Sequence, residues 1–192
     1  RLPGGNAARN YGFEVCEGEY VQWFDSDDIM HSDKIKLQLE GLLEGKHNLA
    51  VCQTAIFKDS LDNHIIKSSW NIVSINIFHD YLVQKVKWLT NSPMCRKSFL
   101  MKSPYLFDEN LKAAQEWEFH CRLLNNVSNY YIVKKVLVFT RQHEYSISNN
   151  EKETIRKLNY FKARLLILNN KDLVLNDETR NYLRNYLLRA FR

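Results

Sequence analysis

The acidic run Asp25-Ser26-Asp27-Asp28 is the first candidate for chemistry, and it follows an apolar segment, residues 19–24, that is typical of a buried strand. In an extended segment, side chains two residues apart point the same way, so Asp25 and Asp27 could reach one ion. Both carboxylates are charged at neutral pH and repel each other unless a cation joins them. Because Mg²⁺ binds through one or two carboxylates plus substrate phosphates, the spacing indicates a clamp for a diphosphate. An acidic turn that caps the next helix through Asp28 is the alternative.

A second pair of acids, Glu116 and Glu118, lies near the front of a helix expected over residues 113–124. Residues two apart on a helix diverge by about 200°, so only one of the two side chains can face a given cleft. A carboxylate held there could act as a general base. Two solvated acids at a helix N-terminus, where the macrodipole favours them, are the alternative.

Histidines add one further candidate, His143, which follows Arg141-Gln142 at the end of a β-rich run. The remaining histidines fall on expected turns or helix faces without partners at ligand spacing, and we assign them no role: His31, His47, His64, His79 and His120.

The segments around these residues alternate between strand and helix patterns, which predicts an α/β domain. Strands are expected at 19–24, 49–57, 64–68, 88–94 and 130–140, with the second and third joined as a hairpin. Helices are expected at 75–86, at 113–124 and from an N-cap at Ser32 to Gly45, and a short helix or turn is expected at 6–12.

The composition of the 192 residues, 45% hydrophobic and 26% charged, is that of an ordinary globular domain. No apolar run approaches the roughly 20 residues that span a bilayer. The four cysteines are far apart in sequence, which favours reduced thiols in a cytosolic protein over a structural zinc site: Cys16, Cys52, Cys95 and Cys121. The first residues lack an initiator Met and a signal-peptide pattern, so we expect the start to be a cut end.

The tail, residues 151–192, carries all of the net charge of +5, since it holds 10 Lys and Arg against 5 Asp and Glu while residues 1–150 hold 17 of each. Its apolar residues recur at helical spacing, which predicts amphipathic helices. The basic face could lie at an anionic lipid surface, against a phosphorylated partner, against the missing half of the protein, or simply in solvent. No basic-aromatic platform accompanies the charge, so we do not expect nucleic-acid binding.

Several motifs occur in the order seen in family 2 glycosyltransferases, which residues 4–148 resemble. They are Ala8-Arg9-Asn10-Tyr11-Gly12, Gly18-Glu19-Tyr20, Asp25-Ser26-Asp27-Asp28, Phe107-Asp108-Glu109, Gln115-Glu116-Trp117-Glu118 and Arg141-Gln142-His143-Glu144-Tyr145-Ser146-Ile147-Ser148. The resemblance implies a GT-A fold, a Rossmann-like α/β sandwich, over residues 1–150, followed by the helical tail at 151–192. The family's first strand-helix-strand unit, which recognises the nucleotide base, has no counterpart here.

The resemblance also implies roles for individual residues. Asp25 and Asp27 would hold Mg²⁺ or Mn²⁺ against the diphosphate of a nucleotide-sugar donor, with His143 near the metal or diphosphate. Arg9 would lie near a phosphate, and a structural ion pair is the alternative for it. Glu116 occupies the position of the family's catalytic Asp, with Glu118 as its competitor. The expected reaction is an inverting transfer to a saccharide or lipid-linked acceptor.

Two other functions stay open from the sequence. A nucleotidyltransferase could use the same metal clamp, and a non-catalytic sugar-binding or assembly module could keep the fold without the activity. We expect a cytoplasmic location, with peripheral contact at the inner face of the membrane through the tail as a further expectation.

Overall fold

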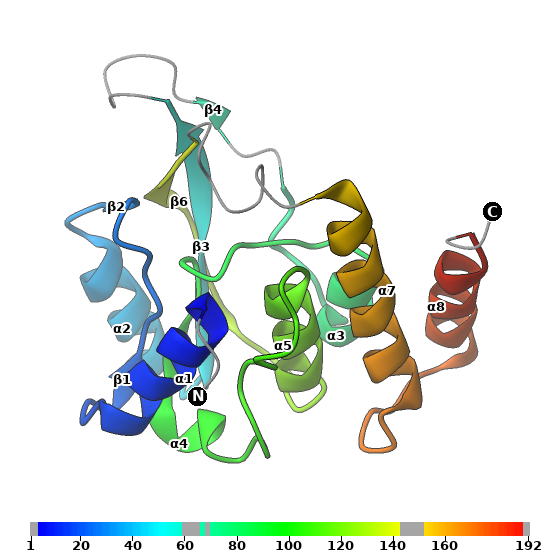
Figure 1. The fold of residues 1–192 in the computed structure, drawn as a ribbon. Helices are drawn as coiled ribbons and strands as arrows, with labels where there is room; N and C mark the ends of the chain where they lie inside the picture. The colour runs from blue at the N-terminus through cyan, green and yellow to red at the C-terminus, as the bar shows by residue number, and fades with distance from the viewer. Residues whose placement is uncertain (1–3, 59–65, 68–69, 143–151, 190–192) are drawn as a thin grey trace.

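A six-stranded mixed sheet forms the centre of the chain (Figure 1). The computed structural model describes residues 4–58, 66–67, 70–142 and 152–189. The strand order is β1-β5-β3-β6-β2, with β4 paired to β3, and the long β3 and β6 run parallel while the other pairs are antiparallel. The strands are β1 (Tyr20–Val21), β2 (Ile29–Met30), β3 (Leu49–Phe57), β4 (Ile66–Lys67), β5 (Met94–Arg96) and β6 (Tyr131–Arg141).

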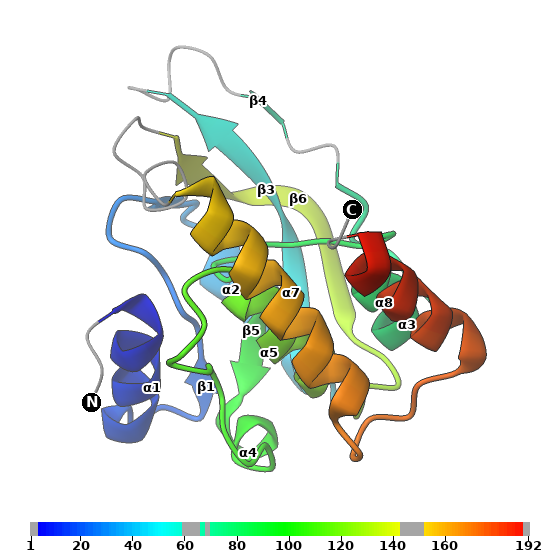
Figure 2. The same cartoon turned by 45° about the vertical axis from the view of Figure 1, so that its right-hand side comes forward.

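Helices cover both faces of this sheet, with α2 on one side and α5, α7 and α8 on the other (Figures 1 and 2). Strand β3 needs cover on both faces because its side chains are apolar on both. Leu49 and Val51 join the core on the α5 side, while Ala50 and Cys52 pack on the α2 side. A strand buried on both faces is apolar throughout rather than alternating. The helices are α1 (Gly5–Val15), α2 (Lys34–Glu44), α3 (Ile77–Leu82), α4 (Lys97–Leu100), α5 (Gln115–Leu124), α7 (Glu153–Asn169) and α8 (Asp177–Arg189).

The tail forms two helices, α7 and α8, as the sequence predicts. Their residues Ala163, Ile167 and Leu183 are fully buried in the same apolar cluster as Val51 of β3. The tail is therefore packed onto the sheet domain through α5, while its separation as a domain of its own stays a prediction. No helix in the described ranges has the length and apolar character needed to cross a bilayer.

Several sequence-based boundaries are wrong. The strand expected at 88–94 is β5, which begins only at Met94, because residues 90–92 form a turn and Pro93 has no N–H for a ladder. The helix expected at 75–86 ends at Leu82, shortly before Gln84 adopts a left-handed φ of 62°. The strand expected at 19–24 pairs only at Tyr20–Val21.

Helix α2 begins one residue later than the expected cap at Ser32 implies. Asp33 occupies the N-cap position, but its carboxylate makes no capping bond and accepts from Lys135 Nζ at 2.7 Å. The other end matches the prediction, because Gly45 is the C-cap and its N–H donates to Gly41 O.

Candidate active site

The acidic run forms a turn between β1 and β2. The N–H of Asp28 donates to the carbonyl of Asp25 at 3.2 Å, and β2 then pairs with β6, Ile29 opposite Phe139. Asp25 and Asp27 are exposed, while Asp28 is half-buried. The expected extended geometry is therefore wrong: a turn, and not strand alternation, places Asp25 and Asp27.

Asp28 faces the fold and fastens this turn to it. Its carboxylate accepts the backbone N–H of Arg141 at 3.0 Å and the side-chain amide of Asn91. Burial raises the pKa of Asp28, and the two hydrogen bonds oppose that rise. The alternative in which Asp28 caps a helix is consequently wrong.

Arg9 reaches the acidic turn from α1. Its Nη2 lies 3.0 Å and 3.3 Å from the two carboxylate oxygens of Asp25, and the side chain of Asp25 is 53% exposed. The same guanidinium is among the charges that lower the pKa of Glu116. Arg9 thus pairs with Asp25 and also acts on Glu116 through its charge.

Glu116 occupies the first turn of α5 and is held by Thr90. The Thr90 hydroxyl donates to Oε2 of Glu116 at 3.0 Å, and the Thr90 backbone N–H donates to the same carboxylate. Burial is the largest influence and raises the pKa of Glu116, while the Thr90 hydrogen bonds and Lys87 lower it. A partly desolvated carboxylate with a raised pKa has the character of a general base.

Glu118 is buried in a different environment. Its Oε1 lies 2.6 Å from Arg122 Nε and its Oε2 lies 2.9 Å from Arg122 Nη2, and Tyr105 donates to it at 3.2 Å. All of its oxygens are therefore engaged by partners inside the fold, which favours a structural role.

One turn, residues 90–92, connects these acids, and we call it the 90–92 segment. Thr90 contacts Glu116, and the Asn91 amide donates to both Asp28 and the Thr140 hydroxyl at 2.9 Å. Ser92 exchanges hydrogen bonds with the backbone of Cys52. Sequence reasoning missed this segment, although the Asn-Ser-Pro order at 91–93 is a turn signal.

The exposed pair Asp25 and Asp27 offers a donor set that suits a divalent cation. Carboxylate oxygens are hard ligands of the kind that Mg²⁺ and Mn²⁺ take, and the Arg9 contact shows that the turn attracts positive charge. Across the described ranges, no three His, Cys, Asp or Glu side chains gather closely enough to hold a metal. His143, the third expected ligand, lies outside the described residues. These acids fit an ion that takes its other ligands from a diphosphate.

Two histidines to which we assigned no role lie in the core rather than on polar surfaces. His120 accepts or donates a 2.8 Å hydrogen bond with the Tyr81 hydroxyl, and burial lowers the pKa of His120 to about 3. His79 is likewise buried and bonds Thr179 of α8 at 2.8 Å. Both are packing residues.

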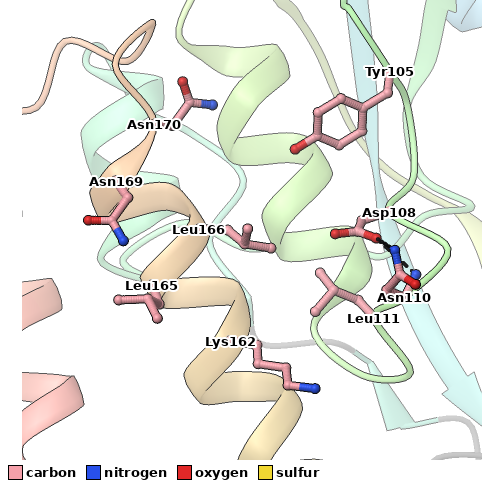
Figure 3. Close-up of a pocket in the computed structure, with 9 residues that line it drawn as sticks. All are labelled: Tyr105, Asp108, Asn110, Leu111, Lys162, Leu165, Leu166, Asn169 and Asn170. Carbon is pink, nitrogen blue, oxygen red and sulfur yellow. Dashed lines mark hydrogen bonds between the residues drawn. The ribbon is translucent and has the colours of Figure 1, made fainter.

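A pocket of about 540 Å³ lies between α7 and the loop at 105–111 (Figure 3). Its lining includes Tyr105, Asp108, Leu111, Lys162, Leu166 and Asn169. None of the candidate acids lines it, so its volume says nothing about the acidic turn.

Known proteins that resemble this chain include glycosyltransferases. Residues 1–106, more than half of the chain, match the family described as Glycosyl transferase family 2. The chain is 26% identical over 156 residues to an uncharacterized glycosyltransferase of Rickettsia typhi, covering 76% of this chain and 46% of that protein. It is 25% identical over 187 residues to the minor teichoic acid biosynthesis protein GgaB of Bacillus subtilis, covering 91% and 19%.

Among solved structures, S. aureus TarS 1-349 in complex with UDP-GlcNAc matches with a TM-score of 0.69 at 18% identity, over 98% of this chain and 53% of that chain. This likeness confirms the expected GT-A fold. The chain spans about half or less of the length of each of these proteins.

Proposed function

Because the chain belongs to glycosyl transferase family 2, we propose that the protein containing it transfers a sugar from a nucleotide-diphosphate donor to a saccharide or lipid-linked acceptor, with inversion. One observation carries this proposal: the 90–92 segment holds Asp28 of the acidic turn and Glu116 of α5 at the same time. This shared support for the acidic turn and Glu116 favours the proposal, because a single displacement needs the diphosphate and the base in a fixed relation.

In this reaction Glu116 takes the proton of the acceptor hydroxyl. The acceptor oxygen forms a bond to the anomeric carbon as the bond from that carbon to the diphosphate breaks, and the nucleoside diphosphate leaves. Burial moves the pKa of Glu116 upward, in the direction of neutral pH, and this makes the carboxylate a better proton acceptor. Thr90 keeps the carboxylate oriented through its hydroxyl and its N–H.

Asp25 and Asp27 would hold Mg²⁺ or Mn²⁺, with His143 as a further ligand. The bound ion would neutralise charge on the leaving diphosphate. Arg9, whose planar guanidinium suits phosphate oxygens as well as carboxylates, contributes a positive charge that pairs with Asp25 and lowers the pKa of Glu116. UDP-GlcNAc, present in the TarS complex, is the donor we propose to test first.

The test compares wild-type protein with Asp25→Asn and Asp27→Asn. Calorimetry with UDP should show Mn²⁺-dependent binding to the wild type and none to either variant, and release of UDP from UDP-GlcNAc should disappear with it. Far-UV circular dichroism checks that the variants fold. Variants that still bind UDP in a Mn²⁺-dependent manner would remove these aspartates from the site.

The tail is proposed to contact anionic lipid at the cytoplasmic face of the membrane. Not all of its charge can serve this purpose, because Arg164 is buried against the rings of Trp117, Tyr160 and Tyr186. Sedimentation with anionic vesicles at low salt tests the contact, and charge reversal at exposed Lys157 and Lys162 should weaken it.

A further inference from the structure

A buried lysine lies directly behind the 90–92 segment. Lys34, at the first position of α2, has no exposed surface. Its Nζ donates to the side-chain oxygens of Gln22 and Gln38 and to the Ser92 carbonyl at 3.1 Å. These partners are all neutral, so among the described residues Lys34 is a buried cation held by dipoles and not by a counter-ion.

The same two glutamines also hold the backbone of the segment. Gln22 Nε2 donates to the Asn91 carbonyl at 2.8 Å, and Gln38 Nε2 donates to the Ser92 carbonyl at 2.9 Å. Lys34 joins both glutamines, so two consecutive carbonyls are fixed by one buried cluster. We call Lys34, Gln22 and Gln38 the lysine clamp.

We propose that Lys34 is a positioning residue of the active site: by fixing the carbonyl side of the 90–92 segment, it sets where Thr90 meets Glu116 and where Asn91 meets Asp28. This inference rests on the proposed function, because Lys34 can position an active site only if Glu116 and the acidic turn form one. Lys34 touches neither Glu116 nor the acidic turn in any hydrogen bond of the described residues and acts through the segment alone.

Burying the positive charge of Lys34 costs folding free energy, as its lowered pKa indicates. Burial lowers its pKa to about 8, and Cys52 on β3 and Cys95 on β5 are the titratable groups that oppose this shift. Between pH 8 and the usual lysine value of 10.5, the folded protein binds fewer protons at Lys34 than the unfolded chain does, so stability rises with pH there. The ammonium instead supplies three N–H donors to three acceptors, and a neutral amine would leave one acceptor unpaired.

Hydrogen exchange tests the clamp without any substrate. In Lys34→Met the amides of residues 90–92 should lose protection by about 10-fold or more, with little change in β3 and β6. Lys36→Met, two residues along the same helix and exposed, is the matched control and should resemble the wild type. Unchanged protection at 90–92 in a folded Lys34→Met protein overturns the proposal.

Wild-type protein provides a second test that needs no variant to fold. From pH 7 to pH 9 the protection factors of residues 90–92 should fall while the urea midpoint stays level or rises. A segment that stays equally protected as Lys34 loses its proton contradicts the clamp.

Kinetics then separate positioning from mere stability. With UDP-GlcNAc as donor, Lys34→Met should lower kcat by about 10-fold while the Kd of UDP changes less than about 2-fold. Equal kcat in Lys34→Met and Lys36→Met overturns the positioning role. A wild type that releases no UDP would count against the proposed donor, and hydrogen exchange would still decide the clamp.

Discussion

Two glutamates on the first turn of α5 have opposite environments although one residue separates them. Glu118 is 1% exposed and forms a two-point ion pair with Arg122, whereas Glu116 accepts hydrogen bonds from Thr90 and, within the described part of the chain, makes no ion pair. The helix turns the two side chains in different directions, so they meet different parts of the fold.

The difference teaches how the fold separates structure from chemistry. Both oxygens of Glu118 are hydrogen-bonded by Arg122 inside the fold, while burial makes the Glu116 carboxylate more basic. Glu118 is therefore expected to determine folding, and Glu116 to determine turnover. Four predictions test this division.

The largest effect should come from breaking the ion pair. Arg122→Met leaves Glu118 buried without its cation, so the free energy of unfolding should fall by about 3–5 kcal/mol. Urea unfolding measures it. The double variant Arg122→Met with Glu118→Gln removes the uncompensated charge and should recover part of the loss. A single variant as stable as the wild type would show that the pair is not structural.

Replacing Glu116 by Gln should leave folding intact and lower turnover by about 10²-fold or more, because the proton acceptor is gone. UDP binding should survive. Glu116→Asp restores the residue type usual in the family and should retain or raise activity. An active Glu116→Gln beside a folded but inactive Glu118→Gln would reverse the two roles.

Thr90→Val should change turnover less than Glu116→Gln does, and the change should appear in the pH dependence. The Thr90 hydroxyl lowers the pKa of Glu116, so its loss raises that pKa further and moves the acid limb of kcat to higher pH. The rate on the acid side of the profile should fall roughly 3–10-fold, with little change on the plateau at higher pH. Thr90→Ser keeps the hydroxyl and should leave the limb unmoved.

The smallest effect concerns stability and pH. Because the folded pKa of Glu116 is raised, the stability it contributes is present below its ordinary value of 4.5 and is lost as pH rises through the folded pKa. Glu116→Gln should therefore gain stability relative to the wild type between pH 4.5 and pH 8. Paired urea titrations at both pH values measure the change, and a constant difference would argue against a raised pKa.

Strong local patterns fixed much of the fold in advance. The apolar run Leu49–Phe57, the β-rich run at 130–140 and the helical spacing at 113–124 each predicted an element close to its observed bounds. Short elements such as β2 and α4 were missed, because a strand of two residues depends on its partner and leaves no periodicity.

For the site, the sequence by itself determined the residue types: the acids at 25–28, Arg9, and Glu116 in the family's motif order. Only the tertiary structure decided their environments. The 90–92 segment connects groups that lie 63 and 26 residues away along the chain, and no local pattern records such contacts. The same holds for Lys34, which looks like one more lysine on an amphipathic helix until packing buries its ammonium against Ser92. Burial and long-range hydrogen bonds set pKa values and orientation, and they exist only once the chain has folded.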